Sequence, residues 1–450
     1  MPETNNKIFR ELCDEARSIY TMEPELYTTF NVKRGLRNAD GSGVLVGLTK
    51  VGEVHGYVLD EGEKLPIYGT LRYRGIDVEE IVHACRKEKR FGFEEVAYLL
   101  LFGSLPSKDT LDKFNSYLGS MRGLPRNFTE DMILKAPSGD IMNKLARCVL
   151  ASYSYDENPD DCSLENVLRQ SFELIARMPV FIAHAYQAKS HYFGGKSLIL
   201  HMPVPELSTA ENFLHLMRAD NEYTPLEAEL LDLALILHAE HGGGNNSAFT
   251  THVVSSSGTD TYSAIAAAIG SLKGPKHGGA NARVMGMIED FKANITDITD
   301  EQQIKNHIVK LLKKESYDHS GLIYGIGHAV YTKSDPRAVL LRENALALAK
   351  QKGMEDEFYL YDIIARNTPK LFAEVKKSDK IVAPNVDFYS GFVYKMLNIP
   401  PEVYTPIFAM SRIVGWCAHR IEEITVSDRI IRPAYKSVSK KTAYVPIAQR

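Results

Sequence analysis

The chain has 450 residues, of which 44% are hydrophobic and 24% charged, a composition typical of a folded globular protein. Its 53 Lys and Arg residues against 57 Asp and Glu residues leave a net charge of −4, which excludes a global basic surface for nucleic acid. Five scattered cysteines, no apolar leader and no apolar run of roughly 18 residues lead us to expect a cytoplasmic protein without a membrane partner.

Short β-prone runs interrupted by glycine predict a small antiparallel β element at about residues 44–74, near the N-terminus. After it the hydrophobic periodicity is helical almost everywhere, so the fold class is mainly α. The clearest start is Thr224-Pro225-Leu226-Glu227, which combines an N-cap, a proline at the first helical position and a capping-box glutamate. The predicted helices include 93–102, one starting after Ser107, 163–189, 224–241, 262–272, 335–353 and 405–424.

Three histidines stand beside glycine-rich turns: His241, His277 and His328. Glycine lets a ligand approach the backbone closely, because no Cβ obstructs it. Each histidine alone is as readily a structural residue at a helix end, but three together favour a binding or catalytic site. The spacing of His238 and His241 also permits a shared metal on one helix face, although no Cys ligand or HExxH pattern accompanies the pair.

Asp387 lies in an apolar and aromatic segment, 384–391. It either caps the helix that follows or acts as a general base, because desolvation raises the pKa of a carboxyl group toward neutrality. Arg337, Arg412 and Arg432 each stand beside apolar residues. An arginine in such a setting favours a carboxylate partner, so the three could hold a dicarboxylate.

These segments together resemble the citrate synthase family over nearly the whole chain. The resemblance is carried, in order, by segments 71–77, 95–106, 241–245, 274–281, 325–337, 384–391 and 432–433. It implies a mostly helical homodimer with a two-domain fold and an active site in the cleft between the domains. The implied reaction condenses acetyl-CoA with oxaloacetate and water to give citrate and CoA, without a metal or redox cofactor.

The family fold implies a large domain at 1–277, a small domain at 278–395 and a return segment at 396–450, which carries the C-terminal arm to the partner subunit. Gly274-Pro275 and the segment 398–401 are the expected chain crossings into and out of the smaller lobe.

The resemblance also implies individual roles. His277 would donate a hydrogen bond to the acetyl thioester oxygen, Asp387 would remove the methyl proton, and His328 would polarise the oxaloacetate carbonyl. His241, Arg337 and Arg412 would bind oxaloacetate or citrate, and Arg432 would complete the active site of the partner subunit. The implied CoA-binding residues are Leu322, Ile323, Tyr324, Gly325, Ile326, Gly327 and Lys333.

Two positions depart from the family pattern. Gly242 stands where many relatives carry an acidic residue directly after the position of His241, and Thr332 stands where some carry a basic residue. Lys333, the next residue, is a candidate to replace that basic group.

Three rival functions stay open on the sequence. A 2-methylcitrate synthase uses propionyl-CoA on the same scaffold, and one added methylene is worth only about 1–3 kcal/mol of discrimination. A metal-dependent hydrolase built on His238 and His241 is a distant alternative, as is a helical binding scaffold without catalysis. Regulation and assembly beyond a dimer are not determined by the sequence.

Overall fold

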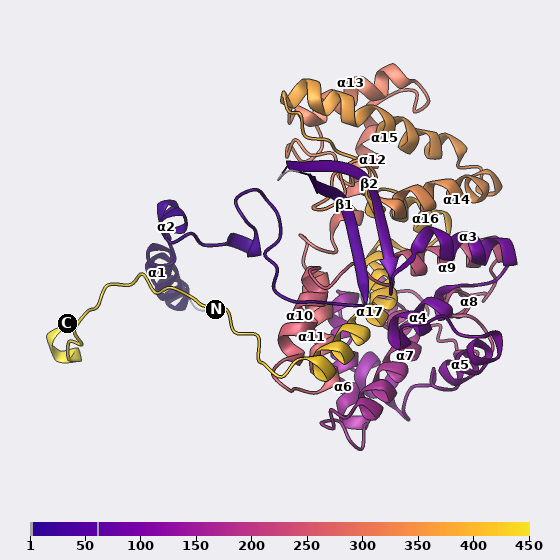
Figure 1. The fold of residues 1–450 in the computed structure, drawn as a ribbon, viewed down its shortest axis with the longest axis horizontal. Helices are drawn as coiled ribbons and strands as arrows, with labels where there is room; N and C mark the ends of the chain where they lie inside the picture. The colour runs from indigo at the N-terminus through magenta and orange to yellow at the C-terminus, as the bar shows by residue number, and fades with distance from the viewer. Residues whose placement is uncertain (1–2, 61–62) are drawn as a thin grey trace. The chain divides into compact units, whose positions relative to one another are not determined.

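The computed structural model describes residues 3–60 and 63–450, in which seventeen α-helices accompany one three-stranded antiparallel sheet (Figure 1). This confirms the mainly α fold with a small β element. The chain forms two compact units, one up to Leu48 and one from Thr49 onward. None of the helices in these described stretches is long and apolar enough to span a bilayer.

The first unit contains α1 (Glu3–Ile19), α2 (Pro24–Thr29) and the short 3-10 helix η1 (Arg34–Leu36). The expectation of β structure from residue 44 is wrong for 44–49. This segment pairs with no strand in the described residues, and the side chains of Leu45 and Leu48 are exposed. A β-prone run without a partner strand or a surface on which to bury its side chains has nothing to stabilise it as a strand.

The sheet begins only at residue 52 and consists of β1 (Gly52–Asp60), β2 (Glu63–Tyr73) and β3 (Ile76–Asp77). Residues 61 and 62, which belong to the predicted β element, lie outside the described residues. In the β1–β2 register Val54 faces Leu71, and the pairing shifts at Gly56. Strand β2 of this hairpin contacts α3, α4 and α14.

Two glycines of this hairpin allow a distant loop to lie directly against it. A Cβ at Gly56 would lie 2.4 Å from the carbonyl oxygen of Val330, and a Cβ at Gly69 would lie 2.3 Å from that of Ser334. No side chain fits into such gaps. The two glycines therefore allow the backbone of the 330–334 loop to pack directly against the sheet.

The helices of the second unit follow in two sets. The first set is α3 (Val78–Glu88), α4 (Phe93–Phe102), α5 (Lys108–Ser120), α6 (Ile141–Ser152), α7 (Leu164–Gly194), α8 (Thr209–Met217), α9 (Pro225–His238), α10 (Asn246–Ser255) and α11 (Thr261–Lys273). The second set is α12 (Ala280–Asn294), α13 (Glu301–Leu312), α14 (Pro336–Lys352), α15 (Glu355–Lys376), α16 (Val386–Met396) and α17 (Tyr404–Val426).

Most predicted helix ends are confirmed by observed caps. Ser107 caps α5, the capping box at Thr224 starts α9, and Gly353 ends α14 in the left-handed conformation. The expected end of α9 at His241 is wrong, because α9 stops at His238. Beyond it Gly242 has a φ of +82°, and its N–H bonds the Glu240 side chain rather than a helix carbonyl.

The long helix α17 is the centre of the second unit and contacts α4, α7, α9, α10 and α11. Helices α12 to α16 pack mainly on one another, with α13 against α15 and α16 against α12 and α14. Figure 1 shows them in the upper part of the view, with α6, α7, α10 and α11 in the lower part. Since α14 and α16 both contact α9, the C-terminal end of α9 lies where the two groups meet.

Candidate functional site

The predicted site residues come from both helix groups. His241 follows α9, and His277 lies in the turn between α11 and α12. His328 lies in the loop before α14, and Arg337 is in the first turn of that helix. The remaining two are Asp387, in the first turn of α16, and Arg412, in the middle of α17.

Three rings form a cluster where the 328–331 loop meets the end of α9. The ring centroids of His241 and His328 are 5.1 Å apart, and the Tyr331 ring lies 5.6 Å from the first and 4.8 Å from the second. The guanidinium of Arg337 lies 5.7 Å from the Tyr331 centroid. The structure therefore brings His241 together with the segment from His328 to Arg337, which lies 87 to 96 positions later in the chain.

The local backbone selects the tautomer of His328. The N–H groups of Val330 and Tyr331 both donate to Nδ1 of His328, at 3.1 Å each. An imidazole nitrogen that accepts hydrogen bonds carries no proton, so in the neutral ring the proton is on Nε2. Nε2–H is then the hydrogen bond donor of the ring.

His241 is a buried, neutral imidazole. Its pKa is lowered well below the usual value, first by burial and then by the positive charge of Arg337. Its Nε2 atom is buried and has no hydrogen bond partner among the described residues. A buried polar atom without a partner is costly, and at a functional site it points to a ligand.

Arg337 is already engaged by a carboxylate. Its Nε and Nη2 atoms donate to Asp335 at 3.0 and 2.8 Å, in a buried bidentate pair. Burial alone lowers the pKa of Arg337, but Asp335 outweighs this effect and raises it above its usual value. Asp335 also accepts the N–H of Val386 at 3.2 Å, so it links the start of α14 to the helix that carries Asp387.

Arg412 is fully buried on α17 with much of its hydrogen-bonding capacity unused. Nε donates to the carbonyl of His238 at 2.6 Å, and the guanidinium lies 4.8 Å from the centroid of Phe408. Nη1 and Nη2 are both buried and have no partner among the described residues. Burial lowers the pKa of Arg412 to about 10, so it still carries its charge at neutral pH.

His277 is held by a polar relay from two other helices. Its Nε2 lies 3.1 Å from Oγ of Ser247, and this hydroxyl accepts the indole N–H of Trp416 at 3.0 Å. Burial, and secondarily Arg412, lowers the pKa of His277 to about 4. The ring is therefore neutral at physiological pH.

Asp387 is not the cap of α16. That role belongs to Asn385, whose side chain accepts the N–H of Asp387 at 3.0 Å. Burial raises the pKa of Asp387 to about 6, although Arg337 and Arg412 oppose the rise. A carboxylate with a pKa near neutrality is a competent proton acceptor, which favours the general-base interpretation.

The predicted CoA-binding loop lies directly beside α16. Gly327 N–H donates to the carbonyl of Ala383 at 2.7 Å, and Asn385 N–H donates to the carbonyl of Gly325 at 2.8 Å. Gly325 has a φ of +76°, and a Cβ there would lie 2.9 Å from the backbone of Phe388. Within the loop, Leu322 is exposed and Ile323 is buried. The Tyr324 hydroxyl donates to Asp318 at 2.5 Å, and Ile326 pairs with Pro384 in an isolated bridge.

Two predicted residues lie apart from this cluster. Lys333 is exposed, with its ammonium 5.9 Å from the ring of Tyr68, while Thr332 bonds the carbonyl of Gly56. Arg432 is exposed on the arm that follows α17, and none of the described hydrogen bonds or ion pairs joins it to the cluster. The single chain thus does not bring Arg432 into the site.

The structure does not favour the metal site at His238 and His241. His238 is buried, and its ring packs 4.4 Å from that of Phe408. Among the described residues, the group with ligand atoms close enough to share an ion is His252, His419 and Glu422.

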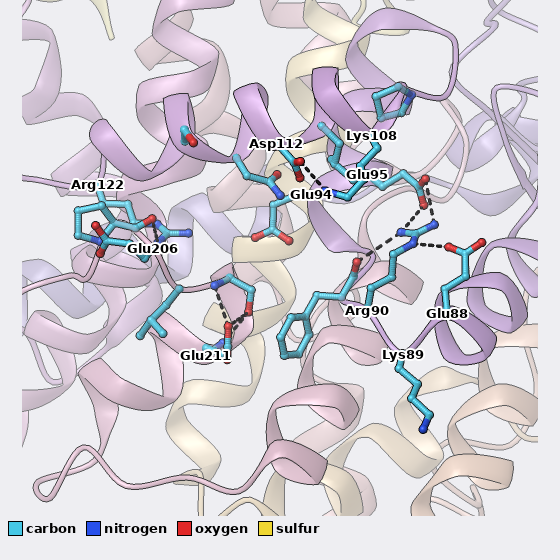
Figure 2. A pocket seen from close by; sticks show the side chains of 18 residues that line it. Glu88, Lys89, Arg90, Glu94, Glu95, Lys108, Asp112, Arg122, Glu206 and Glu211 are labelled. Atoms are coloured by element: carbon cyan, nitrogen blue, oxygen red, sulfur yellow. Dashed lines mark hydrogen bonds and ion pairs between the residues drawn. The ribbon is translucent and has the colours of Figure 1, made fainter.

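A cavity of about 790 Å³ lies elsewhere, between α3, α4, α5 and the segment before α8 (Figure 2). None of the predicted site residues is among those that line it. Its charged groups are largely paired with one another: Arg90 with Glu88 at 2.6 Å and with Glu95 at 2.9 Å, and Lys108 with Asp112 at 2.6 Å. It lacks the unpartnered buried groups of the histidine cluster.

Several residues of the site were not singled out by the sequence. Ser247, Tyr331 and Asp335 stand within four positions of a predicted residue or its glycine turn, and this proximity is the available signal. Trp416 carries a different signal, as the sole tryptophan of the chain.

Comparison with known proteins decides the family. Residues 40–434 match the family model described as "Citrate synthase, C-terminal domain". The chain belongs to the citrate synthase family. It is 33% identical to the citrate synthase of Synechocystis sp. over 85% of this chain and 88% of that protein. It is also 33% identical to the 2-methylcitrate synthase of Shewanella oneidensis, over 84% and 92% of the two chains.

A solved structure has the same fold. It is described as the ternary complex of carboxymethyl coenzyme A and oxaloacetate with the citrate synthase of Thermoplasma acidophilum. The TM-score is 0.74 at 26% identity, over 93% of this chain and 99% of that one. The protein is thus an acyltransferase of the citrate synthase family, as the sequence resemblance predicted.

The Asp387→Asn variant should be more stable than the wild type at pH 7–8 and lose this advantage below about pH 4. The folded protein holds the carboxyl proton with a pKa of about 6, above the usual 3.8. The stability from this proton is fully present below about pH 4 and is lost as the pH rises through about 6. Urea midpoints across this range test the prediction, with the exposed Asp428→Asn as control. An equal difference between Asp387→Asn and the wild type at pH 4 and pH 8 would contradict it.

Proposed function

We propose that this chain is a citrate synthase that condenses acetyl-CoA with oxaloacetate and water to give citrate and CoA. The observation that carries the proposal is that Arg412, buried on α17, acts on the pKa of three groups at once: the half-buried carboxyl group of Asp387, whose pKa is raised, and the neutral imidazoles of His277 and His241. Carbon–carbon bond formation at a thioester methyl needs this combination of a base and neutral hydrogen bond donors.

The first step is enolisation. Asp387 takes a proton from the methyl carbon of the thioester, and the electrons of the C–H bond move onto the carbonyl oxygen. A neutral His277 stabilises that oxygen by donating a hydrogen bond. When the Ser247 hydroxyl donates its hydrogen bond to Nε2, the ring carries its own proton on Nδ1, from which it can donate to the substrate oxygen.

The second step is attack of the enol carbon on the ketone of oxaloacetate. The Nε2–H of His328 donates a hydrogen bond to the ketone oxygen, which takes up the electron pair of the C=O bond as the new carbon–carbon bond forms. This oxygen then gains a proton and becomes the hydroxyl group of the product, while Asp387 releases the proton that it removed, so no net proton is consumed. The buried Nη1 and Nη2 atoms of Arg412 and the buried Nε2 of His241 support a dicarboxylate site. Nε and Nη2 of Arg337 already donate to Asp335, so we propose that Arg337 binds the substrate carboxylate through Nη1 and through its positive charge.

The last step is hydrolysis of the citryl thioester by water, which releases citrate and CoA. Neither this step nor the preceding ones changes a redox state, so the proposed reaction uses no redox cofactor, and we expect full activity in EDTA. Closure around both substrates would exclude water until condensation is complete. We propose the small domain at 278–395 as the moving part, with Gly274-Pro275 and Gly391 beside its hinges.

Coenzyme A is proposed to bind along the loop 322–327, which is bonded to the start of α16 and so lies beside Asp387. Lys333, exposed at the sheet edge, is the proposed contact for a CoA phosphate. We also propose a homodimer in the cytoplasm. The exposed C-terminal arm carries Arg432 away from its own cluster, which supports a role in the site of the partner subunit.

The choice of acyl group decides between the two activities found among the relatives. We expect CoA release with oxaloacetate to show a higher kcat/KM for acetyl-CoA than for propionyl-CoA. The Asp387→Asn variant should lose kcat by about 10²–10⁴-fold, because the amide cannot accept the methyl proton. A higher kcat/KM for propionyl-CoA makes the protein a 2-methylcitrate synthase, and a fully active Asp387→Asn removes Asp387 as the base.

Subunit mixing tests the role of Arg432. The Arg432→Ala and Asp387→Asn proteins should each be nearly inactive, but statistically mixed dimers should recover about a quarter of the wild-type activity. Each mixed dimer then has one site with both an intact Asp387 and an intact partner Arg432. Absence of recovery after confirmed subunit exchange would mean that Arg432 acts within its own chain, and a fully active Arg432→Ala would exclude the residue.

A further inference from the structure

A fully buried carboxylate stands immediately before His241. Glu240 has an exposed fraction of 0%, and so has His419 on α17, whose Nε2 lies 2.9 Å from Oε1 of the carboxylate. The same oxygen accepts the N–H of Gly242. The Glu240 side chain therefore connects α17 to the residues on both sides of His241.

Glycines on two sides make the room for this carboxylate. A Cβ at Gly52, at the start of β1, would lie 2.6 Å from Cγ of Glu240. A Cβ at Gly415, on α17, would lie 2.3 Å from its Oε2. Any side chain at either position would displace Glu240. The two glycines therefore leave the space that the Glu240 side chain fills between β1 and α17.

A chain of hydrogen bonds runs from His419 through His252 to Glu423. Nδ1 of His419 lies 3.1 Å from Nε2 of His252, and Nδ1 of His252 lies 2.7 Å from Glu423. A doubly protonated His419 donates to both Glu240 and His252, and a neutral His252 then donates to Glu423. Although burial alone would lower the pKa of His419, Glu240 and Glu422 raise it to about 9, which agrees with this arrangement.

The ion pair also acts on Arg412. The charge of Glu240 raises the pKa of this buried guanidinium, against the effects of burial and of Arg337. Arg412 is two helical turns before His419, on the same side of α17. One carboxylate thus supports both a histidine and an arginine of the proposed oxaloacetate site.

We propose that Glu240 and His419 are positioning residues of the oxaloacetate site: their buried ion pair fastens the turn that carries His241 to α17, the helix that carries Arg412. This inference rests on the proposed function of His241 and Arg412.

A metal site is an alternative role for part of this chain of residues, because ligand atoms of His252, His419 and Glu422 lie within 4.8 Å of one another. A divalent ion there would need both facing ring nitrogens unprotonated. The 3.1 Å separation of these nitrogens is instead that of a hydrogen bond, which favours the ion pair.

Glu240→Gln and His419→Gln test the proposal, because both keep the side-chain size while removing the charge. Each should raise the KM for oxaloacetate by about tenfold or more, while the KM for the acyl-CoA changes less than twofold. The double variant, in which two amides can bond each other, should be no worse than the poorer single variant. His307→Gln is the matched control, since it breaks another buried pair, 2.8 Å between His307 and Asp290, and should lower stability without changing either KM.

Three results would overturn the proposal. The first is a loss of stability like that of the control with an unchanged KM for oxaloacetate, and the second is an equal rise in both KM values. The third is a stoichiometric metal in the purified wild type that His419→Gln loses. Calorimetric titration with oxaloacetate alone separates a failure of this proposal from a failure of the proposed function. If the wild type binds oxaloacetate but releases no CoA, the proposed function fails, yet the affinities of the variants for oxaloacetate still test the role of Glu240 and His419.

Discussion

The buried guanidinium of Arg412 is the charge on which the rest of the site depends. It lies in the middle of an apolar helix, and it helps to keep His241 and His277 neutral while opposing the rise in the pKa of Asp387. A positive charge in a region of low dielectric constant is tolerated only with nearby negative charge and good hydrogen bonds. Glu240 supplies part of that charge within the protein, and the proposed substrate supplies the remainder.

Close backbone approaches bring the parts of the site together. Gly56 and Gly69 admit the loop that follows His328 onto the sheet, and Gly325 allows the CoA loop to lie against α16. Asp335 then joins α14 to α16 through Arg337 and the N–H of Val386. These contacts hold the segment from Gly325 to Arg337 against both the sheet and the start of α16.

The sequence predicted the helices well wherever a cap marked the end, as at Ser107, Thr224 and Gly353. It failed at 44–49, because strand formation depends on a partner strand rather than on local β propensity. It also extended α9 to His241, although α9 ends at His238 and the chain turns away through Gly242, which has a positive φ. The supporting pair of Glu240 with His419 spans 179 positions, and no local pattern indicates such a contact.

The central claim is that burial beside Arg412 keeps His277 neutral, ready to stabilise an enolate oxygen. Nitrogen-15 NMR of the imidazole rings tests it most directly, with the His277→Gln variant to identify the signals. The account predicts that His277 keeps the chemical shifts of a neutral tautomer from pH 8 down to pH 5, because its pKa is about 4. Imidazolium shifts for His277 at pH 6, as expected for an ordinary histidine, would contradict it.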